Sequence, residues 1–151
     1  MRNFQRTILK EGKLNGVGLH TGKIANIKFI PAVINHGIKF QRLDIDDSPI
    51  IEANVDYVTS VERGTTISKN NVNISTVEHL LAAIVGLQID NILIQIDTEE
   101  VPILDGSSVE FIKCLEKCEF KDQDAARNYI EISEKILYKD EKNNVEIAAY
   151  P

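Results

Sequence analysis

Short runs of isoleucine, phenylalanine and valine alternate with glycine, asparagine, aspartate and proline over the first half of the chain. This pattern is typical of short strands joined by turns, and it predicts strands at residues 5–10, 24–30, 37–43 and 50–55. Two further short strands, at residues 65–69 and 72–74, flank Asn70-Asn71, a pair that tolerates the positive φ of a tight hairpin. We therefore expect a mostly antiparallel sheet.

Two later segments change to the helical period of 3.6 residues. Residues 75–85 and 108–118 each form an apolar stripe, made of Val77, Leu80, Leu81, Ile84 and Val85 in the first and of Val109, Phe111, Ile112, Leu115 and Cys118 in the second. An alternating segment at residues 91–96 predicts another strand between them. Two helices on one face of a mostly antiparallel sheet make a two-layer α+β sandwich.

Each predicted helix starts with a serine that is followed three residues later by glutamate, in Ser75-x-x-Glu78 and Ser107-x-x-Glu110. This spacing is typical of the capping box, in which both side chains satisfy free amides of the first turn. Before the second helix, Asp105 precedes Gly106 in a turn, where we expect it to bind local backbone amides.

The composition changes after residue 120, because residues 121–127 are mostly charged and small and are typical of a linker. Beyond them the pattern predicts strands at residues 129–132, 135–138 and 145–149, with a turn over residues 140–144. A small isolated sheet is only marginally stable. We therefore divide the chain into an N-terminal domain at 1–120, a linker at 121–127 and an incomplete segment at 128–151, and we expect the first part to fold without the last.

Composition narrows the function classes. With 151 residues, 43% of them hydrophobic, the chain can form a real core, and its net charge of −6 argues against a general nucleic-acid-binding protein. No apolar run is long enough to span a bilayer and no signal-peptide core is present, so we expect a cytoplasmic protein. Cys114 and Cys118 are expected to be reduced packing residues, and Glu99 and Glu100 to be solvated charges at a strand end.

The adjacent pair Glu78-His79 is the most informative chemical feature, because it places a carboxylate beside a potential metal ligand at the start of a helix. Each helical residue turns by about 100°, so Glu78 flanks the apolar stripe and His79 points nearly away from it. Three interpretations are open: a helix cap at Glu78, a solvated His79, or a site for a metal or partner. One histidine does not suffice for a catalytic zinc site, which needs three protein ligands.

Five blocks in order along the chain carry a resemblance to a known family. They are Gln5-Arg6-Thr7, Gly16-Val17-Gly18-Leu19-His20-Thr21-Gly22, Ser75-Thr76-Val77-Glu78-His79-Leu80-Leu81-Ala82-Ala83, Gly86-Leu87-x-Ile89-Asp90-Asn91 and Val101-Pro102-Ile103-Leu104-Asp105-Gly106-Ser107. They closely resemble UDP-3-O-acyl-N-acetylglucosamine deacetylase, the zinc amidase of lipid A biosynthesis. The resemblance implies that Glu78 is the general base, that His79 binds Zn²⁺, and that Leu19 and His20 line the substrate site. For His20, a structural hydrogen bond in a glycine-supported turn is an equally good interpretation.

The departure from the family pattern is as informative as the match. In the family, the other two zinc ligands come from a His-x-x-x-Asp element in a second, C-terminal domain. This sequence has only His20, His36 and His79, and none has aspartate four residues later. The resemblance therefore implies an N-terminal half, with residues 128–151 as the first strands of a truncated second α+β domain.

Such a half is expected to be inactive toward a UDP-sugar substrate by itself, and to need the C-terminal half of the same enzyme as its partner. Two alternatives stay open. One is a non-catalytic binding or scaffold module with the same fold, and the other is half of a nucleotide-sugar transferase.

Overall fold

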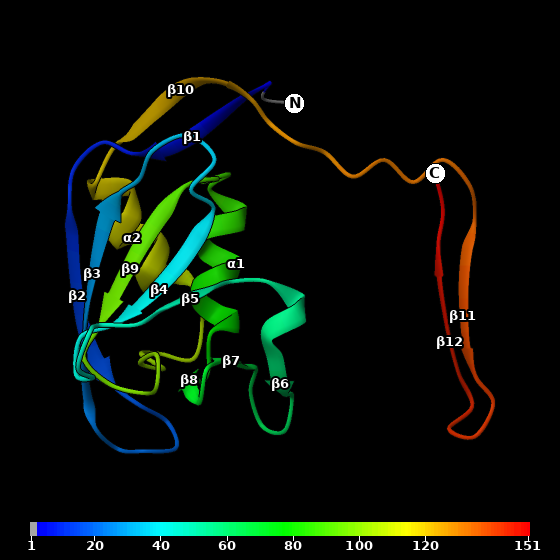
Figure 1. The fold of residues 1–151 in the computed structure, drawn as a ribbon, viewed down its shortest axis with the longest axis horizontal. Coiled ribbons are helices and arrows are strands. Elements are labelled where there is room, and N and C mark those ends of the chain that lie inside the picture. The colour runs from blue at the N-terminus through cyan, green and yellow to red at the C-terminus, as the bar shows by residue number, and fades with distance from the viewer. Residues whose placement is uncertain (1–2) are drawn as a thin grey trace.

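A computed structural model of the chain describes residues 3–151. Its centre is a five-stranded sheet in the order β2-β3-β9-β4-β5, in which neighbours are antiparallel except for the parallel pair β4 and β9 (Figure 1). The strands are β2 Gly12–Val17, β3 Ile24–Pro31, β9 Ile92–Ile96, β4 Ile38–Arg42 and β5 Ile50–Glu52. All but β2 were predicted; glycine and polar residues interrupt the apolar alternation of β2, so the pattern misses it.

Two helices, α1 Glu78–Gly86 and α2 Val109–Lys117, cover one face of this sheet (Figure 1). Every second side chain of the central strands is buried, as expected where only one face is covered. The buried members are Ala25, Ile27 and Phe29 in β3 and Ile92, Ile94 and Ile96 in β9. This is the α+β sandwich that the sequence predicts.

The buried face of α1 differs from the predicted stripe in one respect. Leu80, Ala83 and Ile84 are buried, whereas Val85 is 66% exposed, so its assignment to the inner face is wrong. The buried residues follow the i, i+3, i+4 row of a helix, and Val85 lies about 100° around the axis from Ile84.

The capping box predicted at the start of α2 does not form. Ser108 is the residue before the helix and makes no side-chain cap, while Ser107 Oγ accepts from Val109 N at 3.2 Å. Asp105 Oδ1 accepts from Ser107 N at 2.9 Å and from Ser107 Oγ at 2.8 Å, as expected for a local turn residue. Glu110 instead pairs with Lys113 at 2.7 Å.

A two-stranded ribbon of β1 Phe4–Ile8 and β10 Phe120–Ala126 closes one end of the sandwich (Figure 1). Most of the stretch predicted to be a linker, residues 121–127, is therefore a strand. Its polar side chains are compatible with this because the backbone pairs with β1, and Gln123 lies in a buried amide cluster with Asn91. Just after β10, the guanidinium of Arg127 binds Asp90 at 2.7 Å.

A separate three-stranded sheet leads into α1. After the short 3-10 helix η1 Val55–Tyr57, it contains β6 Val58–Ser60, β7 Thr66–Lys69 and β8 Val72–Ile74. The predicted hairpin is confirmed, because Asn70 and Asn71 join β7 to β8 with φ of 51° and 64°.

The C-terminal hairpin pairs β11 Ile136–Asp140 with β12 Val145–Ala149 around the predicted turn. No strand forms over residues 129–132, contrary to prediction. The chain runs extended from β10 to β11 (Figure 1), and both faces of the hairpin are largely exposed. The division into two domains stays a prediction.

Both cysteines are free, as predicted, and burial raises the pKa of the Cys118 thiol to about 11. Within residues 3–151, neither helix is long and apolar enough to cross a membrane.

Candidate active site

The chain enters α1 through a bridge between two segments that are distant in sequence. Ser75 N donates to Glu99 O at 2.9 Å and Val101 N donates to Ser75 O at 3.1 Å, so Ser75 lies parallel to Glu100. Thr76 then takes a φ of 58°, a left-handed conformation that reverses the chain. The helix therefore begins at Glu78, three residues later than predicted.

Glu78 does not form the predicted capping box. Ser75 Oγ donates to Glu99 O at 3.2 Å, and the residue before the helix, Val77, makes no side-chain cap. Instead Glu78 Oε2 accepts from the backbone N–H of Thr65 at 2.9 Å, in the turn before β7. Because Ser75 is already held by the bridge, the glutamate is free to reach this turn.

His79 lies half-buried beside it, in agreement with the expectation that it is not a core residue. Its backbone carbonyl accepts from Ser108 Oγ at 2.9 Å, which ties the first turn of α1 to the start of α2. Its imidazole makes no hydrogen bond or ion pair to any residue that the structure describes. The ring is therefore available to a ligand.

The loop between β2 and β3 carries Leu19 and His20, both exposed. His20 Nε2 lies 3.1 Å from the carbonyl oxygen of Arg63. A carbonyl only accepts, so Nε2 carries the proton and Nδ1 is unprotonated in the neutral ring. His20 and Glu78 thus bind opposite ends of the same short turn, at Arg63 and Thr65, and the structure brings these two site candidates together. The contact with Arg63 is a structural hydrogen bond of the kind that the sequence analysis gave as one interpretation of His20. Among the described residues the structure gives no polar contact of the Leu19 side chain, so its role stays a prediction.

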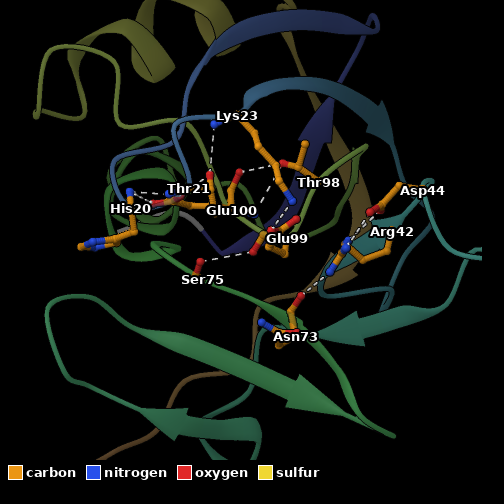
Figure 2. Close-up of polar contacts among 10 residues, drawn as sticks. All are labelled: His20, Thr21, Lys23, Arg42, Asp44, Asn73, Ser75, Thr98, Glu99 and Glu100. Atoms are coloured by element: carbon orange, nitrogen blue, oxygen red, sulfur yellow. Dashed lines mark hydrogen bonds and ion pairs between the residues drawn. The ribbon is translucent and has the colours of Figure 1, made fainter.

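Glu100 is the site residue that the sequence analysis misses. It was expected to be a solvated charge, but it is completely buried and accepts from the backbone of His20 and Thr21 (Figure 2). Burial acts to raise the pKa of Glu100, but the hydrogen bonds from Thr21, His20 and Thr76 outweigh it and hold the pKa below the ordinary value. Its neighbour Glu99 is 30% exposed and pairs with Lys23 at 2.7 Å, so it is only partly the solvated charge that was expected.

A signal for Glu100 was present in the sequence. The buried positions of β9 are the even-numbered ones, Ile92, Ile94 and Ile96, and this period continues beyond the strand through Thr98 to Glu100. Extending the alternation by four residues places the Glu100 side chain inward.

Metal-binding residues are few in this region. Among residues 3–151, no group of three or more histidine, cysteine, aspartate and glutamate side chains is arranged to hold a metal ion. His79 offers one imidazole, and His36 is distant in the fold, where its ring Nδ1 lies 3.0 Å from Gly37 O. The described residues therefore fit part of a metal site at His79 and not a whole one.

Comparison with known proteins gives the same family as the sequence blocks. The family model described as UDP-3-O-acyl N-acetylglycosamine deacetylase (LpxC) matches residues 5–151. The bifunctional enzyme LpxC/FabZ of Chlorobaculum tepidum is 46% identical over 97% of this chain and 32% of its own length. The corresponding enzyme of Bacteroides thetaiotaomicron is 43% identical over the same shares. The UDP-3-O-acyl-N-acetylglucosamine deacetylase of Ruthia magnifica is 38% identical over 97% of this chain and 48% of its own length.

The chain thus spans about a third of the bifunctional relatives and about half of the single deacetylases. The match covers both the Glu78-His79 turn and the His20 loop, as well as β11 and β12 near the end of the chain. This chain belongs to the UDP-3-O-acyl N-acetylglycosamine deacetylase family.

Proposed function

We propose that this chain is the N-terminal part of a zinc-dependent deacetylase of lipid A biosynthesis, which hydrolyses the N-acetyl group of UDP-3-O-acyl-N-acetylglucosamine. The observation that supports this most directly is the pairing of Glu78 and His79 at the start of α1, facing a turn that His20 also binds. The relatives named as deacetylases of this substrate match the chain over 97% of its length.

Glu78 is proposed as the general base. Its Oε2 is fixed by Thr65, while beside Oε1 lies Gly64, whose missing side chain leaves space: a Cβ there would be 3.4 Å from Oε1. In the proposed reaction Glu78 takes a proton from water as the water oxygen attacks the amide carbonyl. The C–N bond then breaks, and a proton reaches the leaving nitrogen to give acetate and a free amine.

His79 is proposed as a zinc ligand. Zinc would lower the pKa of bound water and polarise the carbonyl when all its ligands are present. Because this chain supplies one imidazole and a catalytic zinc needs three protein ligands, we propose that the others come from the remaining part of a longer protein. The chain alone is then inactive.

The partner of this domain is proposed to be the C-terminal half of the same enzyme. The relatives are two to three times longer than the matched region, which leaves room for such a half. Val85 of α1 and Val109 of α2 are 66% and 45% exposed on the helical layer, which suits coverage by a further layer. The cytoplasmic location predicted from the sequence suits a nucleotide-sugar substrate.

The test compares this chain with a longer version that continues through the second domain, in acetate release from the UDP-sugar and in zinc content. We expect stoichiometric zinc and turnover in the longer protein only. Zinc and substrate binding without acetate release would favour the non-catalytic module instead. Stoichiometric zinc in the monomeric 151-residue chain would contradict the view that ligands are missing.

A further inference from the structure

A buried carboxylate without a role in the proposed chemistry lies next to the candidate site. The Glu100 side chain is 0% exposed and collects donors on both oxygens. Oε1 accepts from His20 N at 2.9 Å and Thr76 Oγ1 at 3.1 Å. Oε2 accepts from Thr21 N at 2.8 Å, Thr21 Oγ1 at 2.7 Å and His20 N at 3.2 Å. A buried charge needs such compensation, and among the described residues no cation pairs with it.

Glu100 is the meeting point of three segments that are distant in sequence (Figure 2). Its own segment is held by Thr98 Oγ1, which donates to Glu100 O at 3.1 Å. Its backbone lies in the parallel bridge with Ser75, and its side chain binds the loop of His20 and Thr21. The bond to Thr76 fixes the left-handed residue two positions before Glu78.

These contacts continue into the two candidate site residues. The backbone N–H of His20 donates to Glu100, and the His20 ring binds the carbonyl of Arg63. Two residues after Arg63, the backbone N–H of Thr65 donates to Glu78. Val77 N also donates to Thr65 O at 3.3 Å, which joins the same turn to the residue before α1. The result is a closed ring of contacts in which Glu100 is the only carboxylate besides Glu78.

The ring requires a carboxylate at this position. Every group that faces Glu100 Oε2 is a donor, including the backbone N–H of Thr21, which has no alternative orientation. A glutamine of the same shape would point its amide N–H₂ at donors on one side or the other. Its neighbour Glu99 is 30% exposed and its carboxylate pairs with the Lys23 side chain, so it faces no such constraint.

We propose that Glu100 is a positioning residue, which sets the orientation of His20 and, through the turn at residues 63–65, of Glu78. The structural part of this inference is independent of the reaction, and its kinetic part rests on the proposed deacetylase function.

The structural part is tested by NMR on the 151-residue chain, comparing Glu100→Gln with the matched control Glu99→Gln at the adjacent, half-buried position. In Glu100→Gln we expect large shifts in the amide signals of His20, Thr21 and Thr65, and loss of the Nε2-protonated tautomer of His20. Glu99→Gln should leave them in place. If Glu100→Gln does not fold, Thr21→Val replaces it, because it removes one donor from an exposed residue. Unmoved His20 and Thr65 signals in a folded variant overturn the inference.

The kinetic part uses the longer protein with its second domain. Misplacement of reacting groups by about 1 Å costs about 10²-fold in rate, so Glu100→Gln should lower kcat by about that factor. Zinc content and KM should change little, and Glu99→Gln should behave as wild type. An unchanged kcat in a folded Glu100→Gln protein overturns the inference. If the wild-type longer protein shows no deacetylation, the proposed function fails, and the NMR comparison still decides the role of Glu100.

Discussion

Glu78 Oε2 accepts a hydrogen bond from Thr65 N at 2.9 Å, across thirteen positions of sequence. The bond joins the first residue of α1 to the turn before β7, so the glutamate is held by tertiary structure and not by its own helix. One carboxylate oxygen is fixed by this contact, and the other faces Gly64. The position of the proposed base therefore depends on a turn that carries no catalytic side chain.

Gly64→Ala should disturb this contact. Gly64 has a φ of 155°, which side-chain-bearing residues rarely adopt, and a Cβ would lie 3.4 Å from Glu78 Oε1 and 3.6 Å from Thr76 Oγ1. Strain of this kind costs about 1–3 kcal/mol in the free energy of unfolding. Urea unfolding of the chain measures the loss, and turnover of the longer protein should fall with it.

Gly86→Ala is the matched control, because nothing lies within 4 Å of a Cβ at Gly86 and its φ is ordinary. Alanine at this helical position should be neutral or more stable by up to about 1 kcal/mol. Equal stability of the two variants would mean that the turn at Gly64 adapts freely and does not fix Glu78.

Glu78→Ala and His79→Ala should separate the roles of the two adjacent residues in the longer protein. Loss of a general base typically slows turnover by about 10²–10⁴-fold, and it should leave zinc content nearly intact. His79→Ala should lower both, since only this change removes a proposed ligand. Metal analysis and acetate release measure the two effects.

Glu110→Ala is the control for that pair, because Glu110 occupies the first turn of α2 and its carboxylate pairs with Lys113. It should retain both zinc and turnover. If Glu78→Ala and His79→Ala lose zinc to the same extent, Glu78 mainly supports the structure of the site.

Glu100 should make the stability of the chain depend on pH in the acid range. Its pKa is lowered in the folded state, because the hydrogen bonds from Thr21, His20 and Thr76 outweigh the effect of burial. An unfolded glutamate titrates near about 4.3, so the unfolded chain binds more protons in this range. The stabilisation is then present above about pH 4.3 and is lost as the pH falls through the folded pKa.

Urea unfolding of wild type and Glu100→Gln at neutral and acid pH isolates this group. Asp44, Asp105 and Asp140 also have lowered pKa values, each through side-chain or backbone hydrogen bonds, but they are common to both proteins. The difference in unfolding free energy should therefore shrink below about pH 4. A difference that is constant with pH would show that the Glu100 carboxylate does not stabilise the fold.

Much of the fold follows from local pattern. The apolar alternation of β3 and β9 and the tolerance of Asn70-Asn71 for positive φ depend on nearby residues, and those predictions are confirmed. β10 was missed because its side chains are polar and its stability comes from pairing with β1, more than a hundred residues earlier. The capping box at Ser75 failed for a similar reason, since Ser75 is held by Glu99, far along the chain, whereas the one at Ser107 failed because Asp105, two residues earlier, binds that serine.

The candidate site shows the same limit. The sequence identifies Glu78, His79 and His20 by their residue types and by the family resemblance. It does not reveal that Thr65 and Arg63 hold two of them, because these contacts use backbone atoms that every residue has. The alternation of buried positions in β9, when it is extended beyond the strand, places Glu100 inward. A carboxylate at a strand end is ordinarily solvated, however, and its burial is explained by the hydrogen-bond donors around it, which the sequence does not show.

The last prediction concerns where the N-terminal unit ends. The sequence places this boundary after residue 120, but β10 lies beyond it and pairs with β1. Gln123 Nε2 donates to Ala32 O at 2.8 Å, and its Oε1 accepts from the buried Asn91 at 2.7 Å. Arg127 closes the unit through Asp90. A chain ending at residue 127 should therefore stay folded, with unfolding free energy close to that of the whole chain, since residues 128–151 are mostly exposed.

A chain ending at residue 120 should be less stable by about 1–3 kcal/mol, because the buried Asn91 amide and the Ala32 carbonyl each lose the hydrogen bond that Gln123 makes with them. Urea unfolding measures the difference, and native-state hydrogen exchange of the whole chain should show weak protection after residue 127. Amides of β11 and β12 as protected as those of α1 in a monomer would mean that the tail belongs to the first unit. If the two truncated chains have equal free energies of unfolding, the first unit ends at residue 120. In that case β10 pairs with β1 but does not stabilise the fold.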